Sequence, residues 1–181
     1  MTKTIIGCGG HAKVVYEIAE QNSIFFDAFI DPKIIEFKNL KKIQESDFFN
    51  AYFMGIGGTI PDNLMHRHHL YKEYKKKGCL SFTLQSAQSY VSTSAIIGIG
   101  TLVAHQAIIQ AGASVGENVI INTGAIIEHD AMIEDGCHIA PGAIILGGAR
   151  IGTCSMIGAA AVILPGQIVS PQTLIPALTR Y

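Results

Sequence analysis

The sequence predicts a small α/β domain followed by a parallel β-solenoid. Three observations support this prediction: a strict six-residue repeat in the second half of the chain, a strand-glycine-helix unit near its start, and a change of composition between them. All ten lysines precede Gly78, whereas residues 90–179 carry only six charged side chains. We therefore expect the α/β domain in residues 1–84 and the solenoid in residues 85–181.

The repeat divides residues 90–179 into fifteen hexads with no residue inserted or lost. The second place of every hexad is Ile or Val, from Val91 to Ile175, and the sixth place is mostly small. A period of six fits neither a helix nor an alternating strand, but it is typical of a solenoid. Each hexad would supply one short strand and a corner, and three hexads would form one triangular coil. The inward Ile and Val side chains would then stack about 4.8 Å apart.

The N-terminal third predicts half of a nucleotide-binding unit. Residues 3–6 form a buried strand that leads through GCGGHAK into an amphipathic helix. Gly7, Gly9 and Ala12 satisfy the G-x-G-x-x-G/A pattern, and Asp31 follows a second strand. A third strand, a helix over about 62–77 and a fourth strand complete a domain too short for a full NAD fold. It could bind one nucleoside diphosphate at the first helix, but the glycines could also form only a tight turn, with Asp31 as a turn residue.

Composition excludes several classes of function. The formal net charge of -1 and the lack of a continuous basic track argue against nucleic acid as a partner. No apolar segment predicts a signal peptide or a membrane span, and the four cysteines lack metal or disulfide spacing, so we expect a reduced cytoplasmic protein. The MHRHHLY run is expected on a solvated helix face. The solenoid's histidines are spaced too irregularly for a shared zinc site, so no metal is expected.

One hexad of the solenoid, IIEHDA, could carry chemistry. His129 takes its fourth place, where side chains leave the core near a corner, and Gly147 takes the same place one coil later. The Gly147 amide should lie about 5 Å along the axis with no side chain between. An imidazole base and a bare amide suit acyl transfer, because the base accepts a proton and the amide stabilises the oxyanion. Asp130 or Glu128 could orient the imidazole, although His129 could also be an ordinary surface histidine.

GCGGHAKVV, followed in order by INTGAIIEHDAMIEDGCHIAPGA, resembles the NeuD/PglD-type sugar O- and N-acyltransferases of bacterial glycan pathways. The resemblance covers residues 3 to about 167. It implies a Rossmann-like domain joined to a left-handed parallel β-helix, a rare exception to right-handed crossovers. It also implies a homotrimer that uses acetyl-CoA at sites between adjacent β-helices. The final IVSPQTLIPALTRY departs from the family pattern because it loses the hexad glycines that precede the adenine end of the coenzyme site.

The resemblance also assigns roles to individual residues. His129 would be the general base and Asp130 the acidic residue that tunes it, where well-studied relatives have Glu. His138 would lie near the acetyl group of acetyl-CoA, and the Gly147 amide would bind the thioester oxygen. The expected substrate-binding residues are Gly9, Gly10, His11, Asp31, Gly57, Gly58 and Asn122.

The favoured function is transfer of an acetyl group from acetyl-CoA to the amine of a UDP-linked 4-amino-4,6-dideoxy sugar. O-acetylation of a sialic-acid-like sugar is the second hypothesis, because the same base serves a hydroxyl. A free sialic acid carries no UDP, and the glycine turn would then be idle. The third hypothesis is a non-catalytic trimeric scaffold, motivated by the short final segment.

Overall fold

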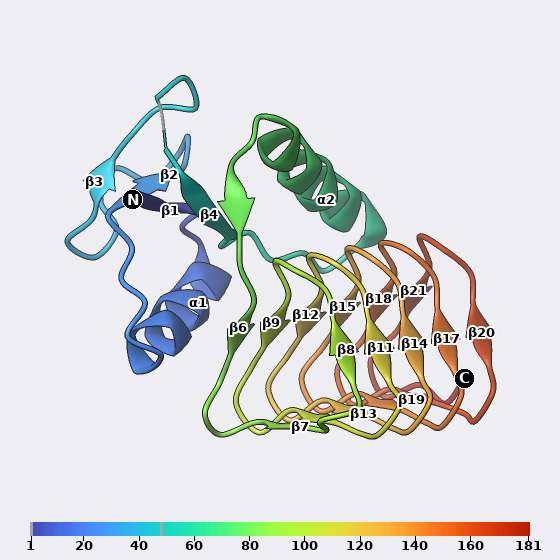
Figure 1. The fold of residues 1–181 in the computed structure, drawn as a ribbon. Helices are drawn as coiled ribbons and strands as arrows, with labels where there is room; N and C mark the ends of the chain where they lie inside the picture. The colour runs from blue at the N-terminus through green and yellow to red at the C-terminus, as the bar shows by residue number, and fades with distance from the viewer. Residues whose placement is uncertain (1, 48) are drawn as a thin grey trace.

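The computed structural model describes residues 2–47 and 49–181 and shows an α/β domain packed on a β-solenoid (Figure 1). The α/β domain has a five-stranded parallel sheet in the order β3-β2-β1-β4-β5. Its strands are β1 (Lys3–Ile6), β2 (Ala28–Ile30), β3 (Lys41–Lys42), β4 (Ala51–Met54) and β5 (Leu80–Ser81), and its helices are α1 (Gly10–Gln21) and α2 (Pro61–Lys76). The expected Rossmann-like domain is confirmed. The short edge strand β3 was not foreseen, because two lysines carry no strand signal.

The two helices cover opposite faces of this sheet. The buried residues of α1, Ala12, Val15, Ile18 and Ala19, follow the helical period and share a core with Phe29 and other residues of the sheet. On the other face, α2 packs Tyr71 and Tyr74 against β1, β2 and β4. Strands β1 and β4 are therefore covered on both sides, which is the usual environment of a parallel sheet.

Each hexad forms one two-residue strand in its first two places. The strands of the solenoid are β6 (Leu84–Gln85), β7 (Tyr90–Val91), β8 (Ile96–Ile97), β9 (Leu102–Val103), β10 (Ile108–Ile109), β11 (Ser114–Val115), β12 (Ile120–Ile121), β13 (Ile126–Ile127), β14 (Met132–Ile133), β15 (His138–Ile139), β16 (Ile144–Ile145), β17 (Arg150–Ile151), β18 (Met156–Ile157), β19 (Val162–Ile163), β20 (Ile168–Val169) and β21 (Leu174–Ile175). Partners such as Ile126 and Ile144 are 18 residues apart, which confirms the triangular coil.

The strands form the three faces of a left-handed parallel β-helix. Face 1 is β7-β10-β13-β16-β19, face 2 is β8-β11-β14-β17-β20, and face 3 is β6-β9-β12-β15-β18-β21. The second place of each hexad points inward, so Ile and Val side chains fill the prism together with small residues of the sixth place. Since β6 pairs with β9, the strand pairing of the solenoid begins at Leu84.

Face 3 packs against the α/β domain (Figure 1). Leu84, Leu102 and Ile120 continue the core that α1 forms with the sheet, and Leu64 of α2 packs on Ala140 and its neighbours. Among the described residues, no helix is both long enough and apolar enough to cross a bilayer.

The expectation of a solvated MHRHHLY run is wrong for part of the run. Arg67 is only 1% exposed and His68 only 5%, whereas His66 and His69 are exposed. The reason is helical periodicity, because Leu64, His68 and Tyr71 lie on the stripe of α2 that faces the solenoid.

We expect Ile133→Ala to destabilise the protein by about 2 to 5 kcal/mol, because Ile133 is 3% exposed and its truncation leaves a cavity inside the prism. Its strand neighbour Met132 points outward and is 43% exposed, so Met132→Ala should cost about 1 kcal/mol or less. Chemical denaturation of the two variants tests this prediction. Equal losses would contradict the assignment of inward and outward places.

Candidate active site

A cavity of about 450 Å³ lies where β1, β2 and β4 end. Because the carboxyl ends of parallel strands meet at one edge of a sheet, the loops that follow these strands converge there. The cavity, called the glycine pocket below, is lined by six of the residues predicted to bind substrate: Gly9, Gly10, His11, Asp31, Gly57 and Gly58. The structure therefore brings the whole N-terminal set together.

The start of α1 opens onto the glycine pocket. Gly9 is the N-cap and provides no side-chain hydrogen bond, and a methyl group added at Gly9 or Gly10 would meet no atom within 4 Å. The first amides of the helix are thus accessible to an anion, which the helix dipole also favours. Gly7 makes the turn possible, because its φ of +85° is left-handed and a Cβ there would lie 2.3 Å from Ile56.

His11 presents an uncharged ring to the same pocket. Burial, helped by the nearby Arg67 and His138, lowers the pKa of His11 to about 3. Its Nε2 is buried and has no hydrogen-bond partner among the described residues. The His11 and His138 ring centroids are 6.5 Å apart. The Nε2 atom is closed off from the pocket in this structure, so His11 forms part of the pocket wall with one unsatisfied ring nitrogen.

Asp31 has a structural role within the pocket wall. Its Oδ2 accepts a hydrogen bond from the Cys8 amide at 2.8 Å, and its Oδ1 accepts from the amides of Lys33 and Ile34. Burial acts to raise the pKa of Asp31, but these hydrogen bonds outweigh it and the pKa is lowered. Asp31 is thus the turn-forming residue that its position before Pro32 suggested, and it leaves little free acceptor capacity for a ligand.

His138 and Asn122 lie on face 3 under the α/β domain. His138 is 7% exposed, its Nδ1 donates to the Gly58 carbonyl at 2.6 Å, and its Nε2 accepts from Asn122 Nδ2 at 3.0 Å. Burial lowers the pKa of His138 to about 4, so the ring is neutral with its proton on Nδ1. Within one chain both ring nitrogens of the predicted acetyl-binding histidine are therefore engaged.

His129, Asp130 and Gly147 form a separate group at the corner between faces 1 and 2. His129 Nδ1 lies 2.9 Å from Asp130 Oδ2, which is possible because Asp130 has a left-handed φ of 59°. A methyl group added at Gly147 would lie 2.7 Å from His129 Nε2, so the ring rests on the glycine. The Gly147 amide donates to no acceptor among the described residues. The Asp130 hydrogen bond is the main reason that the pKa of His129 is raised.

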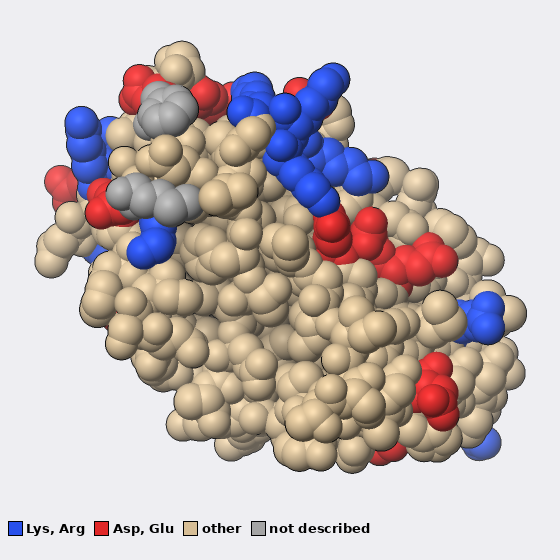
Figure 2. Space-filling view, viewed as in Figure 1, with Lys and Arg blue, Asp and Glu red and all other residues tan. Residues whose placement is uncertain are grey.

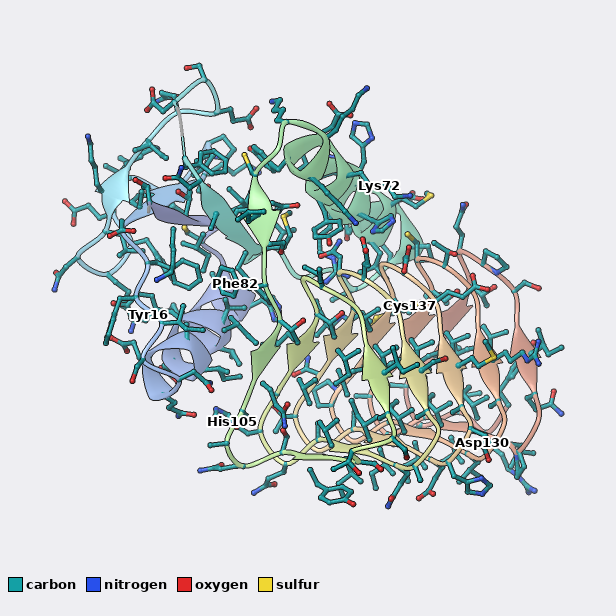
Figure 3. All side chains as sticks on the ribbon, in the orientation of Figure 1. Tyr16, Lys72, Phe82, His105, Asp130 and Cys137 are labelled. Carbon is teal, nitrogen blue, oxygen red and sulfur yellow. The ribbon has the colours of Figure 1, made fainter. Side chains whose placement is uncertain are left out.

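This corner is far from the glycine pocket within one chain. His129 follows β13 of face 1 and precedes β14 of face 2, so it occupies the corner opposite face 3, on which His138 lies. Figure 3 shows Asp130 at the lower edge of the prism and Cys137, the neighbour of His138, at the upper edge below α2. The filled interior of the prism separates the two groups.

Comparisons with known proteins agree with this arrangement. The family described as "PglD N-terminal domain" matches residues 4–74, and "Bacterial transferase hexapeptide (six repeats)" matches residues 130–165. The acetyltransferase domain of PglB from Neisseria gonorrhoeae is 29% identical, with a TM-score of 0.90 over 99% of this chain and 90% of that chain. PerB from Caulobacter crescentus, solved with CoA and GDP-perosamine, is 25% identical, with a TM-score of 0.91 over 100% of this chain and 88% of that chain. No curated protein sequence matches.

These matches confirm the predicted resemblance to the PglD/NeuD-type hexapeptide-repeat sugar acyltransferases. Sequence reasoning missed one group of residues, the buried residues that join α2 to the solenoid, among them Arg67 and Asn118. The available signal was the helical spacing from Leu64 to Tyr71, which places Arg67 beside the buried stripe. Across residues 2–47 and 49–181, no three His, Cys, Asp or Glu side chains are grouped as metal ligands would be.

We expect Asp130→Asn to lower the pKa of His129 toward the ordinary value of an imidazole, because the amide removes the charge that stabilises the imidazolium. Glu128→Gln is the matched control. It keeps the Asp130 hydrogen bond and removes a smaller charge effect, so its decrease should be smaller. Titration of the His129 ring by NMR measures both. A His129 pKa that is the same in Asp130→Asn as in the wild type would refute the pairing.

Proposed function

We propose that this chain transfers the acetyl group of acetyl-CoA to the amine of a nucleotide-linked amino sugar. The observation that carries the proposal is the His129 ring, oriented by Asp130 and resting on the Gly147 backbone. A PglB acetyltransferase domain 28% identical to this chain was solved with acetyl coenzyme A, with a TM-score of 0.88 over 99% of this chain and 91% of that chain. The PerB structure with CoA and GDP-perosamine supports a sugar nucleotide as the acceptor.

The proposed chemistry follows from the geometry of the corner. The Asp130 carboxylate accepts a hydrogen bond from the Nδ1–H of His129, which leaves the lone pair of Nε2 free to act as a base. Nε2 accepts the proton of the sugar amine as the new C–N bond forms at the thioester carbonyl. The free Gly147 N–H stabilises the oxyanion of the tetrahedral intermediate. When this intermediate collapses, the C–S bond breaks and the imidazolium returns the proton to the departing thiolate, giving CoA thiol and the sugar acetamide.

The glycine pocket supports a nucleoside diphosphate sugar over a free sugar as the acceptor. The open amides of α1 suit a diphosphate, and His11 forms part of the wall beside them. A sialic-acid-like acceptor has no diphosphate and would leave this pocket unused. We propose a UDP-linked 4-amino-4,6-dideoxy sugar of bacterial glycan biosynthesis as the acceptor. The GDP-linked sugar is the comparison, because PerB was solved with GDP-perosamine.

We further infer that the protein acts as a homotrimer. The outward row of face 1 is entirely apolar and comprises Tyr90, Ile108, Ile126, Ile144 and Val162. Figure 2 shows charged side chains gathered mainly over the α/β domain, with large uncharged areas over the solenoid. Since the base and the glycine pocket lie on opposite sides of one prism, the pocket of a second copy packed beside face 1 would complete the site. The four unpaired cysteines suit the cytoplasm.

His129→Gln should reduce acetyl transfer by about 10² to 10⁴, because the variant has no base to accept the amine proton. The matched control is His105→Gln. His105 has the same place in its own hexad but lies at another corner, bound to Ser86. Thiol release from acetyl-CoA is followed with UDP- and GDP-linked 4-amino sugars and with a sialic acid. Wild-type turnover by His129→Gln would remove the base assignment, and absence of thiol release with every acceptor would favour the scaffold.

Ile144→Glu should convert the trimer to monomers, because it places a charge in the apolar row of face 1. It should also abolish transfer, since one chain does not bring the base to the pocket. Ile168→Glu on face 2 is the control, because Ile168 is 66% exposed and lies outside the proposed contact. Sedimentation velocity measures both variants. A monomeric wild type, or a trimeric Ile144→Glu, would show that face 1 does not join the copies.

A further inference from the structure

Arg67 of α2 is a buried cation that binds only backbone. It is 1% exposed, and its Nη2 donates to the carbonyl oxygens of Asn118, Gly136 and Cys137, the last two at 2.9 and 3.3 Å. Asn118 and Gly136 occupy the same corner, between faces 2 and 3, in successive coils. Within residues 2–47 and 49–181, no carboxylate forms a salt bridge with Arg67.

The helix that Arg67 holds is a wall of the glycine pocket. The pocket is lined by Gly58 and Thr59, just before α2, and by Asn63 and His66 of its first turns. Arg67 lies one turn after Asn63. Arg67 Nη2 also donates to the carbonyl of Cys137, the residue before His138. His138 in turn donates to the Gly58 carbonyl at the pocket rim. Figure 3 shows Cys137 at the corner below α2. A closed set of contacts thus joins helix, corner and pocket rim.

Burial of an unpaired guanidinium costs desolvation free energy, which lowers its net contribution to holding the helix in place. An apolar side chain of similar size would pack on the corner without losing hydration, so fold stability alone does not explain the residue. The Arg67 guanidinium differs because its Nη2 donates to carbonyls of two successive coils, which fixes α2 at one height along the solenoid. Lys75 also joins α2 to the solenoid, through Glu117 at 2.7 Å, but its side chain is 51% exposed and such a pair contributes little.

We propose that Arg67 is a positioning residue for the sugar-nucleotide pocket, holding α2 on the solenoid so that Gly58 stays bound to His138. This inference rests on the proposed function for its kinetic consequence, but not for the contact itself. Burial lowers the pKa of Arg67 to about 10, so it is charged at neutral pH. Its charge also helps to lower the pKa of His11 and of His138, which keeps both rings neutral beside the pocket.

The kinetic test compares Arg67→Met with Lys75→Met. Both changes remove one positive charge and the contacts that it makes between α2 and the solenoid, and only Arg67 is buried. For Arg67→Met we expect KM for the sugar nucleotide to rise about tenfold or more, with KM for acetyl-CoA within about twofold of wild type. Lys75→Met should leave both constants within about twofold. Arg67→Lys, which keeps the charge but replaces the planar guanidinium with an ammonium, should fall between them.

A second readout needs no substrate. The ¹⁵N shifts of the His138 ring report which nitrogen carries the proton, and in Arg67→Met the Nδ1–H pattern should change as the Gly58 contact loosens. An unchanged His138 pattern together with an unchanged sugar-nucleotide KM overturns the inference, as does an equal rise of both KM values. A changed pattern in a protein that acetylates no sugar nucleotide supports the contact and contradicts the proposed function.

Discussion

The stacking of hexads at an interval of 18 residues is the constraint on which the rest of the structure depends. It repeats the same backbone hydrogen bonds from coil to coil, so the surroundings of a residue are decided by its place in the hexad and by its face. His129 and Gly147 meet because they hold one place in successive coils. The same stacking aligns the carbonyls of Asn118 and Gly136 for a single guanidinium. One periodic backbone therefore positions the base and the pocket wall.

The corner at Asp130 shows how this periodic backbone sets the direction of one carboxylate. The equivalent places in the coils before and after it are Gly112 and Gly148, with φ of 71° and 68°, and Asp130 adopts the same left-handed backbone with φ of 59°. A residue with a Cβ is strained there by roughly 1 to 2 kcal/mol relative to glycine. The left-handed backbone turns the carboxylate back onto its own neighbour, His129, which a flat strand would not allow.

Periodicity explains both what the sequence predicts and what it does not. The contact between His129 and Gly147 follows from the repeat alone, as does the alternation of inward and outward residues. The engagement of His138 does not, because its partner Gly58 belongs to another domain and no period relates the two. The helical spacing of α2 places Arg67 beside a buried stripe, but its acceptors are backbone carbonyls of the solenoid, to which no period relates it. The single lysine pair of β3 likewise forms a strand only because β2 offers it an edge.

Three histidines of the chain lie in different environments, and each environment fits a different role in the proposed reaction. Burial lowers the pKa of His11 and of His138 to about 3 and 4, so neither ring carries charge at neutral pH. The His129 ring is exposed and paired with Asp130, and its pKa is raised instead. A base that must gain a proton in the transition state needs the second environment, whereas a ring that only directs a hydrogen bond needs the first. Because these environments lie on opposite sides of the prism, the proposed reaction requires a neighbouring chain to bring them together.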